Sequence, residues 1–193
     1  MRLYGTSRSH FTRVVRMCCV ELSLSPEWTD VGNVGLATAF GGNPLMRVPV
    51  LAHDDLTLWE TDTICRYLVS QAGRDPIGLH RLDWAHHNQL AVVRGIMDAD
   101  VRLVLAERSG LHATGRVFDK VRQTIHGGLA WIESEVAAAG AAPRSLDYPT
   151  LWTIAMWDHL LLYGHVTQDV APGLDQYLAA FAPHEAVSST APS

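Results

Sequence analysis

The segment "TSRSHFTR" (residues 6–13) is rich in hydroxyl side chains, among them those of Ser7, Ser9 and Thr12. It lies between a short apolar stretch and a helical pattern, so Ser7 or Ser9 is expected to cap the helix. A hydroxyl at a helix start can also donate a hydrogen bond to a bound anion, which the helix dipole favours. If Ser9 lies at the start of the helix, its hydroxyl can donate a hydrogen bond to such an anion.

A thiolate is one anion that such a hydroxyl can stabilise. A hydrogen bond to a charged group contributes roughly 1.5–3 kcal/mol. At about 1.36 kcal/mol per pKa unit, Ser9 would lower the pKa of a bound thiol by roughly one to two units. A thiol with a pKa of about 8.5 would then be substantially ionised at neutral pH. The alternative is that Ser7 and Ser9 only cap the helix.

Pro49 interrupts the apolar run "VPVLA" (residues 48–52). A proline in such a run indicates an edge strand, a bulge or a special turn. A cis Val48–Pro49 bond would leave the backbone N–H and C=O of Val48 free to pair with an extended peptide ligand. From this residue alone an ordinary trans proline is favoured, because only about 5–6% of X-Pro bonds are cis.

Glu60 and Thr61 stand where a strand pattern gives way to a helical one. The Thr61 side chain can cap this helix, and its N–H is one of the unpaired donors of the first turn. A ligand carboxylate could bind the N–H and hydroxyl of Thr61, with Glu60 nearby to receive a ligand ammonium. A simple cap after a strand is again the alternative.

The elements that must position these residues follow from periodicity. Strands are expected at 2–6, 27–31, 48–52 and 56–60, and helices at 11–22 and 61–72. After the linker-like "GRDPIGLH" the strand signals end, and helical patterns cover 81–108, 115–139, 150–163 and 174–181. Thr150 is the expected N-cap of the third of these helices. The prediction is an α/β domain (residues 1–74), a linker (75–80) and an all-α domain (81–193).

Composition narrows the class of protein. The 193-residue chain carries a net charge of −5, and its 15 basic residues are scattered, which argues against nucleic-acid binding. The N-terminus lacks the apolar core of a secretory signal, and Asp158 and His159 interrupt the most apolar segment, so no membrane association is expected. The three cysteines form no CxxC pair and suggest a reducing compartment. The sequence indicates a cytoplasmic protein.

Metal binding is not expected from the ten histidines. His86 and His87 are adjacent and therefore point away from each other on a helix, and no HxxxH spacing joins an acid. Asp98 and Asp100 are expected on a solvated helix face. The three cysteines, Cys18, Cys19 and Cys65, are interpreted as packing residues. The tryptophans Trp84, Trp152 and Trp157 are interpreted in the same way, with one of them as a candidate to line a ligand pocket.

The order of these motifs resembles the cytosolic glutathione S-transferases, of the bacterial-like type with a serine at the site. "RLYGTSRSHFTRVVR" is similar to LYxSxxSPFxRKVR, "GGNPLMRVPVL" to NPxGKVPVL, and "ETDTICRYL" to ESxAIxxYL. "PTLWTIAMWDHL" lies where that family has a buried helix, and "APHEAV" resembles its RPxV. The resemblance covers nearly the whole chain.

The resemblance implies a thioredoxin-like domain followed by a helical domain, assembled as a homodimer that conjugates glutathione to small electrophiles in detoxification. Ser9 would hydrogen-bond the glutathione sulfur. Val48, beside cis-Pro49, would pair with the cysteinyl part of glutathione. Glu60 and Thr61 would hold the γ-glutamyl end. Arg47 stands where the family often has a lysine near the glycyl carboxylate.

The sequence departs from the family pattern at three positions. His10 replaces the proline that commonly follows the serine, Thr61 replaces serine, and Thr153 replaces the aspartate of a helical capping box. No thiol occurs in "SHFT" (residues 9–12), which argues against dithiol chemistry. Two alternatives remain: a non-catalytic module for dimerisation or protein docking, and a glutathione-dependent isomerase, dehalogenase or ether-cleaving enzyme.

Overall fold

The computed structural model describes residues 1–140 and 145–193. Its N-terminal part is a four-stranded sheet with the strand order β2-β1-β3-β4. Strand β1 pairs in parallel with β2 and antiparallel with β3, which pairs antiparallel with β4. The strands are β1 (Arg2–Gly5), β2 (Glu27–Asp30), β3 (Val50–His53) and β4 (Leu56–Trp59).

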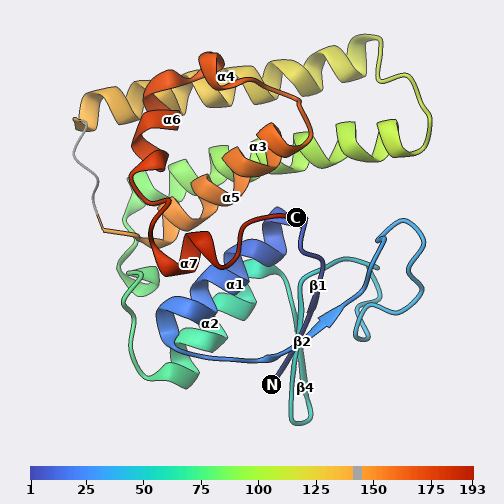
Figure 1. The fold of residues 1–193 in the computed structure, drawn as a ribbon, viewed down its shortest axis with the longest axis vertical. Coiled ribbons are helices and arrows are strands. Elements are labelled where there is room, and N and C mark those ends of the chain that lie inside the picture. Colours follow the sequence, from blue (N-terminus) through green and yellow to red (C-terminus); the bar gives the residue numbers. More distant parts are fainter. Residues whose placement is uncertain (141–144) are drawn as a thin grey trace.

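Helices α1 (His10–Leu22) and α2 (Thr61–Ala72) lie side by side next to this sheet (Figure 1). The apolar stripe expected on α1 is buried, and it packs with Leu3 and Leu51 of the sheet in one hydrophobic cluster. Cys18, Cys19 and Cys65 belong to this cluster, as expected. The predicted order of a β-α-β unit followed by a β-β-α unit is therefore confirmed.

The C-terminal part is helical. Helix α5 lies between α1 and α3, and α4 runs along α3 (Figure 1). The elements are the 3₁₀ helices η1 (Leu79–Arg81) and η2 (Gln168–Val170) and the α-helices α3 (Trp84–Arg108), α4 (Arg116–Ala139), α5 (Tyr148–Leu162), α6 (Pro172–Ala179) and α7 (Glu185–Ser188). The predicted class, a thioredoxin-like domain followed by a helical domain, is confirmed. The limits at residues 74 and 81 stay a prediction.

Helix α5 begins two residues before its predicted start. Its N-cap is Asp147, whose Oδ1 accepts hydrogen bonds from the N–H of Thr150 at 3.0 Å and from its hydroxyl at 2.6 Å. Thr153 instead donates to the carbonyl of Pro149 at 2.8 Å. The prediction of Thr150 as the cap was wrong, because Pro149 is tolerated in the first turn of a helix, where no N–H partner is needed.

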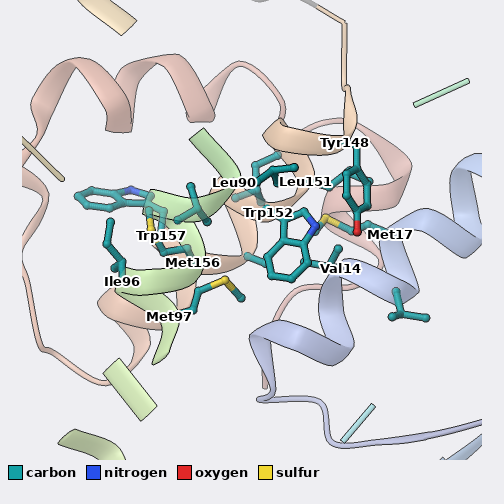
Figure 2. Close-up of a cluster of buried hydrophobic side chains, with 14 of the residues drawn as sticks. Val14, Met17, Leu90, Ile96, Met97, Tyr148, Leu151, Trp152, Met156 and Trp157 are labelled. Carbon is teal, nitrogen blue, oxygen red and sulfur yellow. The ribbon is translucent and has the colours of Figure 1, made fainter. Parts of the chain in front are cut away.

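One hydrophobic core joins the two parts of the molecule. Figure 2 shows Val14 and Met17 of α1 beside Tyr148 and Trp152 of α5, all buried. Burial of this face of α1 against α5 fixes the helix that begins next to Ser9. Trp152 and Trp157 pack as expected, whereas Trp84 is 85% exposed, so its predicted packing role was wrong.

No helix within residues 1–140 and 145–193 is both long and apolar enough to span a membrane.

Candidate functional site

Ser9 is the N-cap of α1. Its Oγ accepts a hydrogen bond from the N–H of Thr12 at 3.2 Å, and its own N–H donates to Oγ1 of Thr6 at 3.1 Å. A hydroxyl can accept and donate at the same time, so capping leaves the Ser9 O–H free to donate to a ligand. The two roles weighed for Ser9 are therefore compatible.

Ser7 does not cap the helix. Its hydroxyl donates to the backbone carbonyl of Ser193 at 3.0 Å, and Nε of Arg8 donates to the same oxygen at 3.2 Å. The loop between β1 and α1 is thereby tied to the last residues of the chain, which leaves Ser9 as the hydroxyl at the helix start.

The Val48–Pro49 peptide bond is cis. Pro49 is buried, and none of the described hydrogen bonds outside the helices and strands uses the backbone of Val48. The preceding loop is held by buried Asn43, whose Nδ2 donates to the carbonyl of Arg47 at 2.9 Å and whose Oδ1 accepts from the N–H of Leu45 at 2.9 Å. Asn43 was missed from the sequence, although the Asn-Pro pair is a turn signal.

The Thr61 side chain does not cap α2, contrary to the prediction. Helix α2 begins at Thr61, and Glu60 stands in the N-cap position with φ of 71° but makes no side-chain cap hydrogen bond. The Thr61 side chain is buried and donates to the carbonyl of Phe11 at 3.4 Å. Thr61 therefore ties α2 to α1 and does not cap its own helix, which corrects the prediction. Its backbone N–H remains a first-turn donor.

Strand register brings these segments to one edge of the sheet. Val50 lies opposite Tyr4 on one side and opposite Trp59 on the other. The loop that leads to Ser9, the Val48–Pro49 bond and Glu60 therefore all start from the same end of three neighbouring strands. Arg47 is exposed at this end and has no ion pair among the described residues.

Asp62, in the first turn of α2, connects this helix to the helical part of the molecule. Asp62 accepts hydrogen bonds from Arg94 of α3 and from the Tyr148 hydroxyl of α5, each at 2.5 Å. Burial raises the pKa of Tyr148 far above its usual value, so this hydroxyl is a neutral donor. The sequence carried no signal for this contact, because the three residues lie far apart along the chain.

The fold and this edge of the sheet define a class of protein, a thioredoxin-like domain joined to a helical domain. Residues 3–76 match the family model described as "Glutathione S-transferase, N-terminal domain". This match supports the resemblance to the glutathione S-transferases over the N-terminal part of the chain. No curated protein matches the sequence significantly.

Solved structures share the fold over the whole chain. A glutathione S-transferase from Methylobacillus flagellatus KT, solved with glutathione bound, has a TM-score of 0.84 and 22% identity, covering 100% of this chain and 99% of its own. One from Methylobacterium radiotolerans JCM 2831, in complex with glutathione sulfonate, has a TM-score of 0.82 and 20% identity, covering 99% and 94%. A maleylacetoacetate isomerase from Methylobacterium extorquens AM1 has a TM-score of 0.75 and 17% identity, covering 100% and 96%.

Proposed function

We propose that this protein is a glutathione transferase that activates the glutathione thiol for attack on a small electrophile. The observation that carries the proposal is the Ser9 hydroxyl, which caps α1, keeps its O–H free and lies at the sheet edge shared by Val48–Pro49 and Glu60. A hydroxyl and a helix N-terminus together favour a thiolate over a thiol. The two transferases of this fold named above were solved with glutathione or its sulfonate.

Each end of glutathione has a matching group on the protein. The Val48 backbone would pair with the cysteinyl part in the manner of strand addition. The Thr61 N–H at the start of α2 would bind the γ-glutamyl carboxylate, and Glu60 its ammonium. Arg47 would meet the glycyl carboxylate. The electrophile would lie between the two domains of a cytoplasmic homodimer with a detoxifying role.

The test is calorimetric titration of glutathione into the pure protein, with the ultraviolet thiolate band recorded across pH. Binding in the micromolar to millimolar range with a lowered thiol pKa supports the proposal. Absence of both favours the alternative of a non-catalytic dimerisation or docking module.

A second candidate keeps glutathione and changes the reaction to isomerisation. The shared fold of the maleylacetoacetate isomerase, whose structure holds malonate and glutathione, favours testing it. A cis-enedioic acid would be offered with glutathione and followed by its absorbance. Conversion to the trans isomer without consumption of glutathione distinguishes isomerisation from conjugation.

A further inference from the structure

His10, the first residue of α1, faces the helical part of the molecule. Its side chain is only 2% exposed, and neither ring nitrogen has a hydrogen-bond partner among the residues that the structure describes. A buried polar atom without a partner destabilises the folded state, and such atoms are rare in native proteins. His10 therefore lacks an interaction that its surroundings would be expected to supply.

Two further ligand-type side chains surround His10. Asp100 of α3 is fully buried and His159 of α5 is 6% exposed. The His10 and His159 rings lie with their centroids 3.9 Å apart, and Nδ1 of His159 contacts Oδ2 of Asp100. One ligand atom from each of the three residues lies within 4.8 Å of the other two.

The donor atoms of the cluster suit cation binding. His10 and His159 each offer an imidazole nitrogen, and Asp100 offers a carboxylate oxygen. Imidazole and carboxylate are common ligands of divalent metal ions in proteins.

We propose that His10, Asp100 and His159 bind one divalent transition-metal ion, for which Zn²⁺ is the best fit. Two imidazoles and a carboxylate form a donor set that Zn²⁺ prefers. Zn–N and Zn–O bonds of about 2.0–2.2 Å in a tetrahedron put donor atoms about 3.3 Å apart, so the side chains need only a small adjustment. The ion replaces the proton between His159 and Asp100, and that proton passes to solvent.

The surroundings of Asp100 resemble the outer shell of a metal site. Its Oδ1 contacts Nδ1 of His165, and Nε2 of His165 lies 3.2 Å from Oε2 of Glu107. Such carboxylate–imidazole chains hold a ligating carboxylate in place. The buried carboxylate of Asp100 also offsets part of the positive charge of the ion.

The ion would join three elements that are distant in sequence. It would hold His10, the first residue of α1 and the neighbour of Ser9, to the middle of α3 and to the last turn of α5. Its role is that of a clamp between the two parts of the molecule. This proposal departs from the expectation of no metal, and it does not depend on glutathione chemistry.

The experiment uses the full chain with its purification tag removed and its metals stripped by a chelator. The protein is titrated with ZnCl₂ by calorimetry and with CoCl₂ by visible absorption, and the bound metal is counted by elemental analysis. We expect one ion per chain and a higher melting temperature with Zn²⁺. Because binding releases a proton, the measured binding enthalpy should change with the ionisation enthalpy of the buffer.

Variants locate the ion. His10→Phe keeps a ring of similar shape and removes the unpartnered nitrogens, so the metal-free variant should fold at least as well as the metal-free wild type. We expect it to bind Zn²⁺ at least about 10–100-fold more weakly, and Asp100→Asn to do the same. The matched control is His87→Ala, which removes an exposed histidine of α3 and should leave the stoichiometry unchanged.

Three results would overturn the proposal. The first is a wild-type protein that binds no Zn²⁺ at micromolar concentration, and the second is a folded His10→Phe variant that binds as tightly as wild type. The third is loss of binding only in the His87→Ala control, which would assign the ion to the surface.

Discussion

Ser9 combines a structural and a chemical task in one hydroxyl, and substitution can separate them. Ser9→Ala removes both the cap and the thiol donor. We expect it to lower the stability of the protein by about 1 kcal/mol and to raise the pKa of bound glutathione by roughly one to two units. Denaturant unfolding measures the first effect and the ultraviolet thiolate band the second.

Two companion variants sharpen that prediction. Ser9→Asp keeps a good N-cap but has no donor when ionised, so stability should be retained while the thiol pKa rises. Ser7→Ala removes a hydroxyl that does not cap α1 and that donates to the carbonyl of Ser193, so it should leave the thiol pKa unchanged. An unaltered thiol pKa in Ser9→Ala would remove Ser9 from the proposed chemistry.

Cys19 provides a second prediction at the scale of one residue. Burial raises the pKa of this thiol to about 12, from a usual value of 9.0. In the folded protein it should resist iodoacetamide at pH 8, whereas the unfolded chain should react, as mass spectrometry of both samples will show. Rapid labelling of the native protein would contradict the buried position.

The same shift has a consequence for stability. Since the folded-state pKa of Cys19 lies above the unfolded one, the folded state holds more protons between these values. The contribution of Cys19 is therefore complete below about pH 9 and is lost as the pH rises towards 12. Cys19→Ser should make that alkaline loss smaller.

Among the elements, α1 and α5 are joined by an ion pair as well as by packing. Arg13 of α1 is buried, and its Nη1 donates to Oδ2 of Asp158 at 2.5 Å. Its other contacts are neutral acceptors, the carbonyl of Val187 at 3.3 Å and Oγ1 of Thr190 at 3.5 Å. Asp158 is the charge that balances this buried guanidinium.

Asp158→Ala should therefore lower the free energy of unfolding by about 3 kcal/mol, the low end for breaking a buried pair, because Asp158 is partly exposed. Urea unfolding gives the value. The control is Asp98→Ala, which removes an exposed carboxylate of α3 and should change stability by no more than about 0.5 kcal/mol. Equal effects of the two variants would contradict the role given to the Arg13 pair.

For the whole molecule, the shared core predicts that the thioredoxin-like part does not fold alone. Residues 1–74 would expose Val14 and Met17, which are fully buried against the helical part in the whole chain. We expect this fragment to lack dispersed amide signals in NMR spectra and to aggregate. A fragment that unfolds cooperatively would show that the contact with α5 is dispensable.

Much of the fold could be predicted because its signals are local. An apolar run marks β3, and the alternation of Leu56 and Leu58 with other residues marks β4. The stripe on α1 has helical spacing, and the hydroxyl of Ser9 follows a strand and precedes that stripe. Motif order then indicated the family resemblance that the match over residues 3–76 supports. The start of α5 was misplaced because Thr150 and Asp147 are both good caps, and only the backbone path through Pro149 decides between them.

The sequence by itself determined the order of elements and the class of fold, and it singled out Ser9, Val48–Pro49 and Glu60–Thr61 as candidate site residues. Tertiary structure alone decided that Thr61 turns inward to Phe11, that Asp62 meets Arg94 and Tyr148, and that Asp100, expected in solvent, is buried beside His10 and His159. The physical reason is that periodicity within one element reports which face is apolar. It carries no record of which polar residues on distant elements that face will meet when the helices pack.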